Sequence, residues 1–200
     1  MQGNRASSLP PRRWPRQDKR CGLTLIEMLA ALTIAALLVT WAVPWMYGWV
    51  LQHRLTTATN SLAAAFALAR QTAISHHRPV ALCAGVPPKC HDAAQWNWGA
   101  GWLMFFDDNR NGLPDDSERL VHSGAAAPQG ITVFANSPLR KTVIFTPLGV
   151  AQQTSGAFTA GRIRLCVHFS ILNNVRDLVL SKSGRLRLEE SDLGGDCPAL

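Results

Sequence analysis

The chain has 200 residues, 47% of them hydrophobic, and carries 20 Lys and Arg residues against 13 Asp and Glu. This length fits a single globular domain with an N-terminal extension. Residues 1–22 contain six of the basic residues and only one of the acids, so residues 23–200 carry 14 bases against 12 acids. The total charge of the chain is therefore no evidence for nucleic-acid binding by the head.

The first 51 residues divide into a basic part and an apolar part. Residues 1–22 are polar, whereas residues 23–51 are apolar apart from Glu27 and a few hydroxyl side chains. At about 1.5 Å per residue the apolar part can span a bilayer as a helix, and the bases before it would stay in the cytoplasm. A secretory signal peptide is cut after its apolar region. Here Gly22 stands before it, so we expect residues 1–22 to be a leader that is removed.

Glu27 is the one acid within the apolar part. Burying a carboxylate in a membrane helix costs about 2.5–3.5 kcal/mol on insertion scales, so it needs a partner. The sequence GLTLIE at residues 22–27 resembles the signature of type IV prepilins and pseudopilins, with Leu23 in place of the usual phenylalanine. The resemblance implies cleavage after Gly22 by prepilin peptidase, methylation of the new amino terminus at Leu23, and pairing of Glu27 with the terminus of a neighbouring subunit. The alternative is an ordinary membrane anchor with a chance glutamate.

We expect the helix to continue beyond the membrane to about Ser75. Along residues 52–77 apolar residues recur at three- and four-residue spacing, which describes one buried stripe. Pro44 lies inside the helix and should kink it; a helix that ends at Pro44 is the alternative. The stripe consists of Leu55, Ala58, Leu62, Ala65, Phe66, Ala69 and Ala73.

After His77 the periodicity changes to short apolar or alternating runs, separated by Gly, Pro, Asn and Asp clusters. Such runs are typical of antiparallel strands, and the Lys182-Ser183-Gly184 turn indicates a hairpin. We therefore predict an α+β, pilin-like fold in which residues 78–200 form a β-rich head, an antiparallel sheet packed on the helix. The expected strands are Val80–Cys83, Trp102–Phe106, Arg119–Val121, Ile131–Ala135, Val143–Phe145, Arg162–Phe169, Leu178–Leu180 and Arg185–Leu188.

Four cysteines remain once Cys21 leaves with the leader, and they allow three pairings. We favour Cys83 with Cys90, which bracket a short loop, and Cys166 with Cys197, which would tie the C-terminus to a strand. Zinc is the competing interpretation, but the cysteines are widely spaced and lack a CxxC. Disulfides require an oxidising compartment, so we expect the head in the periplasm.

Residues 98–112, WGAGWLMFFDDNRNG, carry a second resemblance. A tryptophan, a Gly-Trp pair, an apolar strand and an Asp-x-Asn-x-Asn-Gly loop are features of the GspH/FimT branch of minor pilins and pseudopilins. With the helix signature and the cysteines, the similarity extends from Cys21 to Cys197. It implies that the partners of this chain are other major and minor pilins or pseudopilins.

The loop in this segment also satisfies the calcium-loop pattern D-x-[DN]-x-[DN]-G-x5-E. Against calcium, a strand rather than a helix enters the loop, Pro114 follows the position of the backbone-carbonyl ligand, and Asp-Asn-Gly runs are ordinary turns. We expect no cofactor and no metal, and keep calcium as the alternative. The matching residues are Asp107, Asn109, Asn111, Gly112 and Glu118, with Asp115 in the ninth position.

Positive charge is concentrated in the C-terminal third. Residues 140–188 contain eight bases and one acid, Asp177, and four acids follow directly. Strand alternation places Arg162 and Arg164 on one face. A bond from Cys166 to Cys197 would draw the C-terminal tail across that face.

The sequence GRLR at residues 184–187 resembles the GRxR motif of FimT-type minor pilins, which bind DNA during natural transformation. Two guanidinium groups on one strand face can each contact a phosphate without reading base sequence. The assigned contacts to double-stranded DNA are Arg185 and Arg187, with Lys182, Arg162 and Arg164 in support. The alternative is a solvated face whose arginines pair with Glu189, Glu190 or Asp192.

The sequence offers no enzyme signature, since the histidines are scattered and GxSxG, HExxH and phosphate-loop motifs are missing. We expect a minor type IV pilin, single-pass in the bacterial inner membrane and then part of a pilus, which assembles into or primes the pilus and binds DNA non-specifically during natural transformation. The alternative is a GspH-like minor pseudopilin with a purely structural role in a type II secretion system.

Overall fold

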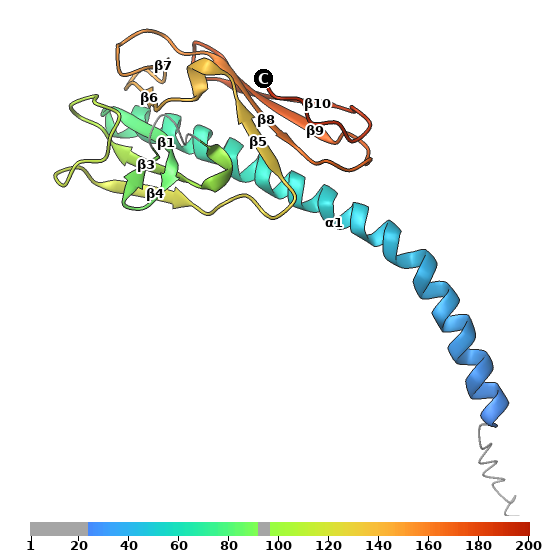
Figure 1. Cartoon of the computed structure of the whole chain (residues 1–200). Helices are drawn as coiled ribbons and strands as arrows, with labels where there is room; N and C mark the ends of the chain where they lie inside the picture. The colour runs from blue at the N-terminus through green and yellow to red at the C-terminus, as the bar shows by residue number, and fades with distance from the viewer. Residues whose placement is uncertain (1–23, 92–96) are drawn as a thin grey trace, which may run out of the picture. The chain divides into compact units, whose positions relative to one another are not determined.

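The structure is a computed structural model that describes residues 24–91 and 97–200. Within them, one long helix, α1 (Leu25–His76), is followed by ten strands and two short 3-10 helices (Figure 1). The chain divides into two compact units, Met1–Ala42 and Val43–Leu200.

Helix α1 begins at Leu25 and remains helical through Pro44. The alternative of a helix that ends at Pro44 therefore does not hold. Every side chain from Thr24 to Thr40 is exposed. Over the described residues, no helix combines the length and the apolar character needed to cross a membrane.

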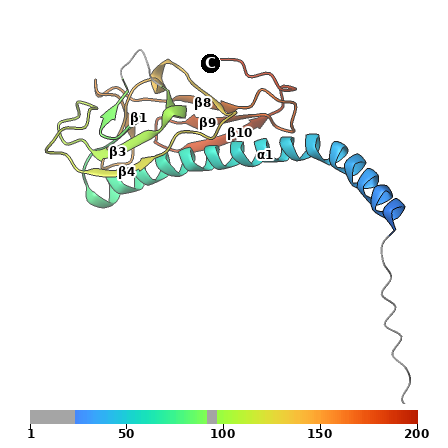
Figure 2. The same cartoon turned by 60° about the horizontal axis from the view of Figure 1, so that its bottom comes forward.

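The second half of α1 packs against both sheets of the head. All seven residues of the predicted stripe are buried, together with Leu51. They belong to one hydrophobic core with inward-facing residues of both sheets, and the views in Figures 1 and 2 show this half of α1 running along both sheets. The sequence periodicity thus identified the buried face of the helix correctly.

The first sheet is antiparallel, with the order β4-β3-β1-β6-β7, and β2 pairs with the end of β1. Its inner face adds Val80, Leu82 and Met104 to the main core, and its other face holds a second cluster around Leu103 and Phe105. The strands are β1 (Val80–Val86), β2 (Lys89–Cys90), β3 (Trp102–Phe106), β4 (Leu120–Gly124), β6 (Val143–Phe145) and β7 (Ala151–Gln152).

The second sheet is also antiparallel, with the order β10-β9-β8-β5. Ile163, Leu165, Leu178 and Leu180 face the helix and are buried. Its strands are β5 (Thr132–Ala135), β8 (Gly161–Cys166), β9 (Val175–Leu180) and β10 (Leu186–Ser191), and the 3-10 helices are η1 (Trp98–Ala100) and η2 (Ser137–Leu139).

The predicted α+β fold, a long helix packed on antiparallel strands, is confirmed, and each expected strand overlaps an observed one. The strand expected at Arg162–Phe169 ends at Cys166. The strands form two antiparallel sheets, a division that the sequence did not predict. Alternation shows which residues face inward within a strand, but the choice of neighbouring strand is a long-range property.

Candidate functional site

The first site expected from the sequence lies at the start of α1. Gly22 and Leu23 lie outside the described residues. Glu27 is exposed in the first helical turn, and its N–H donates to the carbonyl and to Oγ1 of Thr24 at 3.1 and 3.3 Å. This is one half of a capping box of the form T-x-x-E, in which an acid near the helix N-terminus is favoured. The sequence spacing could have revealed this second role of Glu27 beforehand.

The second site is the hairpin that joins β9 to β10. Ser181 Oγ accepts a hydrogen bond from Arg185 N at 3.1 Å, and Gly184 N donates to Ser181 O at 2.9 Å. Gly184 has φ +73°, and a Cβ there would stand 2.2 Å from Gly149 O. A glycine is therefore required by the turn and by the close approach of the neighbouring backbone. The turn leaves Lys182 and Arg185 exposed on either side of Gly184.

Arg70 of α1 lies beside this hairpin, which the sequence did not indicate. Its Nε donates to Gly149 O at 3.0 Å. Arg70 and Arg185 line one groove between the helix and the hairpin, together with Gln71 and Ser75. The helical pattern predicted only that Arg70 lies outside the buried stripe. Its contacts with Gly149 and the hairpin were not predictable from that pattern, because those residues are far from Arg70 along the chain.

Arg187 projects from β10 on the outer face of the second sheet, and its side chain is 71% exposed. Its Nη2 contacts Glu189 Oε1 at 2.5 Å. Glu189 also accepts an ion pair from Arg162 Nη2 at 3.1 Å. The alternative predicted from the sequence, in which these arginines pair with nearby acids, therefore holds for Arg187 and Glu189. Arg185 and Lys182 form no ion pair with any described residue.

Arg162 and Arg164 of β8 converge on Asp177 of β9. Arg164 Nε and Nη2 each lie 2.9 Å from an Asp177 oxygen, and Arg162 Nη1 lies 2.8 Å from Oδ2. The Asp177 side chain is 4% exposed and that of Arg164 14%. The hydrogen bonds that Arg164 donates to Asp177 raise the pKa of Arg164 above its ordinary value. Because Asp177 engages both guanidinium groups and Glu189 also contacts Arg162, these two arginines are less available for DNA than the sequence suggested.

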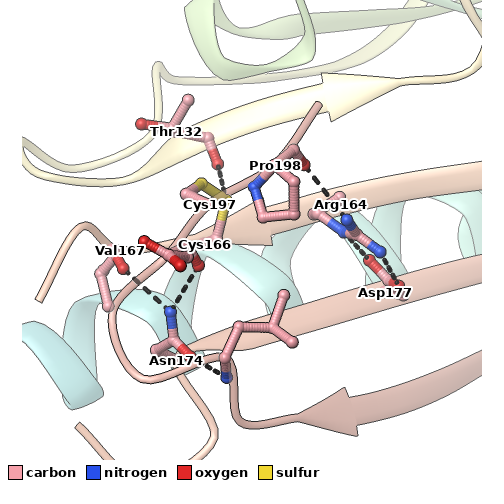
Figure 3. Close-up of a disulfide and its surroundings, with 10 residues drawn as sticks. Thr132, Arg164, Cys166, Val167, Asn174, Asp177, Cys197 and Pro198 are labelled. Carbon is pink, nitrogen blue, oxygen red and sulfur yellow. Dashed lines mark hydrogen bonds and ion pairs between the residues drawn. A yellow bond between two sulfur atoms is a disulfide. The ribbon is translucent and has the colours of Figure 1, made fainter. Parts of the chain in front are cut away.

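The C-terminal tail is fixed beside this network (Figure 3). A disulfide joins Cys166 to Cys197, and Arg164 Nη1 donates to Pro198 O at 3.1 Å. Buried Asn174 donates to Asp196 O at 2.8 Å, and its Oδ1 accepts from the backbone N–H of Leu193 at 2.7 Å. No sequence pattern indicated this role of Asn174, because its partners lie in segments that only the tertiary structure brings together.

The second disulfide joins Cys83 of β1 to Cys90 of β2. Both disulfides are the pairs favoured from the sequence. The bonded cysteines are 7 and 31 residues apart, so each disulfide closes a loop and limits the conformational freedom of the unfolded chain.

The third site is the loop between β3 and β4. Asp107 is fully buried. Its Oδ2 accepts from Gly112 N at 3.0 Å, and its Oδ1 has no hydrogen-bond partner among the described residues. Burial raises the pKa of Asp107 to about 6, because desolvation disfavours the ionised carboxylate.

The remaining side chains of this loop turn toward one another. Asn109 Nδ2 and Asn111 Nδ2 donate to the same oxygen, Asp115 Oδ2, at 2.7 and 2.9 Å. Glu118 accepts from the backbone N–H groups of Asp108 and Asp115 at 3.1 and 3.3 Å. Across residues 24–91 and 97–200 there is no cluster of three or more His, Cys, Asp or Glu side chains that could hold a metal.

Comparison with known families matches residues 58–184 to the family described as "Type II transport protein GspH". Residues 17–43 match the prokaryotic N-terminal methylation motif. The first match covers more than half of the chain and includes α1 from Ala58, the disulfide-bonded strands β1, β2 and β8, and the hairpin turn up to Gly184.

Two crystal forms of the type IV minor pilin FimU from Pseudomonas aeruginosa have a similar structure. One has a TM-score of 0.52 at 20% identity, with 69% of this chain and 90% of that chain covered. The other has a TM-score of 0.46 at 20% identity, with 67% and 91% covered. At this identity the first likeness shows the fold alone. No curated protein sequence matches the chain significantly.

Proposed function

Since this chain belongs to the GspH family and carries an N-terminal methylation motif, we propose that it assembles into or primes a type IV pilus and binds double-stranded DNA through the β9–β10 hairpin. The chain is a type IV minor pilin or pseudopilin, a membrane-anchored component of a pilus or pseudopilus. In this proposal it is a structural and binding subunit without enzymatic activity.

The observation that carries the assembly role is the contrast between the two halves of α1. From Leu51 onward one stripe of the helix is buried in the head, whereas from Thr24 to Thr40 every side chain is exposed and most are apolar. A continuous apolar surface in water is unfavourable. We propose that lipid of the inner membrane covers it first, with the head in the periplasm, and that helices of other pilins cover it after assembly.

Glu27 lies within this apolar surface, and a carboxylate in apolar surroundings requires a partner. The proposed partner is the methylated amino terminus at Leu23 of a neighbouring subunit, made available when prepilin peptidase cuts after Gly22. Before assembly the capping contact with Thr24 holds the first turn of the helix.

Variants at Gly22 and Glu27 test the assembly role. Bulky substitution of Gly22 should leave the leader attached, as mass spectrometry of the protein would show. Glu27→Gln keeps the side-chain length that a capping box accepts but removes the charge, so this variant should be cut normally and be depleted from sheared fibres. Mature wild-type protein that retains residues 1–22 would contradict the processing, and normal assembly of Glu27→Gln would contradict the charge pairing.

The DNA-binding role depends on the lack of carboxylate partners around Lys182 and Arg185. Elsewhere on the same sheet, Arg162, Arg164 and Arg176 are all paired with acids. Cations on an exposed turn can contact phosphates without reading base sequence. Arg187 joins them in this proposal, because its pairing with Glu189 leaves most of the side chain exposed.

Gel retardation of duplex DNA by the processed full-length chain in detergent tests this role. The Arg185→Ala, Arg187→Ala double variant should abolish binding at low salt. The matched control, Arg119→Ala with Lys141→Ala, removes the same charge from two exposed positions elsewhere on the head and should bind normally. Equal retardation by wild type and the hairpin variant would contradict the site.

The competing function is a purely structural pseudopilin of a type II secretion system. The pairing of Arg187 with Glu189 favours it, because this guanidinium is partly neutralised within the chain. In that case deletion of the gene should impair secretion while DNA uptake and DNA retardation stay unchanged.

A further inference from the structure

We propose that the loop from Asp107 to Glu118 binds one Ca²⁺ ion, with side-chain oxygens of Asp107, Asn109, Asn111, Asp115 and Glu118 as ligands. Calcium prefers six to eight oxygen ligands from carboxylates, amides and carbonyls, and a twelve-residue loop supplies them from positions 1, 3, 5, 7, 9 and 12 with glycine at position 6. The sequence fulfils this spacing. The proposal is independent of DNA binding.

The decisive observation is the unsatisfied oxygen of Asp107. This side chain is fully buried, and within residues 24–91 and 97–200 its Oδ1 has no hydrogen-bond partner. Its other oxygen accepts from Gly112 N at 3.0 Å, so the carboxylate points into the loop that it begins. A buried carboxylate oxygen without a partner is costly, and a cation held within the loop would satisfy it.

The side chains that carry the other proposed ligand atoms lie next to one another. Nδ2 of Asn109 and Nδ2 of Asn111 both donate to Asp115 Oδ2, which brings the side chains at positions 3, 5 and 9 together. Glu118 at position 12 folds back to accept from the N–H groups of Asp108 and Asp115. The loop is therefore closed from its first to its last position around the side chains that carry the oxygens.

Calcium binding would not require the observed backbone hydrogen bonds of the loop to break. Oδ1 of Asn109 accepts from Asn111 N at 2.9 Å, and Oδ1 of Asn111 accepts from Leu113 N at 2.7 Å. Each such oxygen has a second lone pair, and so do both oxygens of Glu118. The same atoms can thus hold the loop in shape and contact a cation.

Entry from a strand does not prevent this arrangement, because the loop is held by its own contacts and by a neighbouring segment. Gly112 has φ +75° at the turn, Thr142 Oγ1 donates to Gly112 O at 2.8 Å, and Thr154 packs against Gly112. Pro114 favours an extended conformation at Leu113 but leaves the Leu113 carbonyl, the ligand at position 7, in place.

The affinity expected from this ligand set is low. No three acids of the loop form a compact cluster, so amide and carbonyl oxygens must supply part of the coordination. Ligand charge and rigidity set calcium affinity, and sites in extracellular modules have Kd values of about 10⁻⁴–10⁻³ M. A head outside the cytoplasm would meet calcium in this concentration range.

Equilibrium dialysis with CaCl₂, on chelator-treated full-length chain in detergent, tests the proposal. We expect saturable binding of one Ca²⁺ per chain, half-saturated at about 10⁻⁴–10⁻³ M, a higher melting temperature with CaCl₂, and weaker binding of MgCl₂. Glu118→Gln and Asp115→Asn should each weaken Ca²⁺ binding about tenfold or more, because each removes a charged ligand.

Asp116→Asn is the matched control, because it removes the same charge from the same loop at position 10, which supplies no ligand. It should bind Ca²⁺ like the wild type. Asp107→Asn should lose binding even where its fold is kept. No bound Ca²⁺ at about 10⁻² M, a concentration well above the weakest class of such sites, would overturn the proposal. Equal losses in Asp116→Asn and Glu118→Gln would overturn it too, since they would indicate nonspecific attraction.

Discussion

The second sheet carries two Arg-x-Arg pairs with opposite surroundings. Arg162 and Arg164 lie on β8 and direct their guanidinium groups at Asp177, which is almost fully buried. Arg185 and Arg187 lie at the start of β10, where Arg187 is largely exposed and Arg185 has no ion pair among the described residues. The same spacing in the sequence thus produces a structural pair and an outward-facing pair.

The position of each strand explains the difference. Strand β8 has a neighbour on both sides, and the disulfide-bonded tail adds Pro198 above Arg164. Strand β10 is an edge strand with β9 as its one neighbour. Cross-strand neighbours determine which side chains meet, so arginines on the inner strand are enclosed and those on the edge strand are left for a partner.

The largest effect is expected on stability, when Arg162 and Arg164 of the inner strand lose their shared carboxylate. Asp177→Asn should lower the free energy of unfolding by about 3 kcal/mol, the lower end of the range for breaking a buried ion pair, because it leaves Arg164 partly buried without its carboxylate. Urea unfolding with intact disulfides would measure this. Glu189→Gln, which breaks ion pairs that are more exposed, should cost less than about 1 kcal/mol. Equal losses in the free energy of unfolding for the two variants would contradict the difference between the two arginine pairs.

The two pairs should also separate in DNA binding. Arg185→Ala should lower affinity for duplex DNA about eightfold at 0.1 M salt, the change expected from losing one phosphate contact, and should reduce the salt slope by about 1. Arg164→Ala should lower the melting temperature and leave DNA affinity unchanged below that temperature. The reverse pattern would assign DNA contact to the inner strand instead.

A smaller effect is expected when Arg187 is released from its own acid. Glu189→Gln removes the carboxylate that contacts Arg187 Nη2, so DNA affinity at low salt should rise about twofold through the added positive charge. The Arg187→Ala background provides the control, since Arg185 still binds DNA there and Glu189→Gln should raise the affinity less than in the wild type. Weaker DNA binding by Glu189→Gln alone would show that Glu189 positions Arg187 for contact.

The smallest effect concerns Arg78 and Asp108, an exposed pair that serves as a reference for the enclosed one. Hydrogen bonding to Arg78 holds the pKa of Asp108 below its ordinary value. Any stability from this pair is therefore present above the ordinary pKa of an aspartate and is lost as the pH falls through the lower, folded-state value. In an NMR titration, Arg78→Gln should return the pKa of Asp108 toward the ordinary value. An unchanged pKa would contradict the pairing.

Local patterns predicted much of the head correctly. The spacing of apolar residues identified the buried stripe of α1, and short alternating runs located eight of the strands. Both patterns succeed because they report which side of an element is apolar, and burial of that side is the main driving force for folding. The same patterns did not indicate that Arg70 lies beside the hairpin or that Asn174 holds the tail, because those contacts join distant segments.

Sequence alone determined the family, the processing motif, the spacing of the Asp107 loop and the face on which each arginine lies. Only the tertiary structure decided which arginines are neutralised, since Asp177 lies opposite Arg164 through the pairing of β8 with β9. It also decided that Asp107 Oδ1 is buried without a hydrogen-bond partner in the part of the chain that the structure describes. The physical reason is the same in both cases: electrostatic and hydrogen-bond partners depend on distances of a few ångströms, and strand pairing, rather than residue spacing, sets those distances.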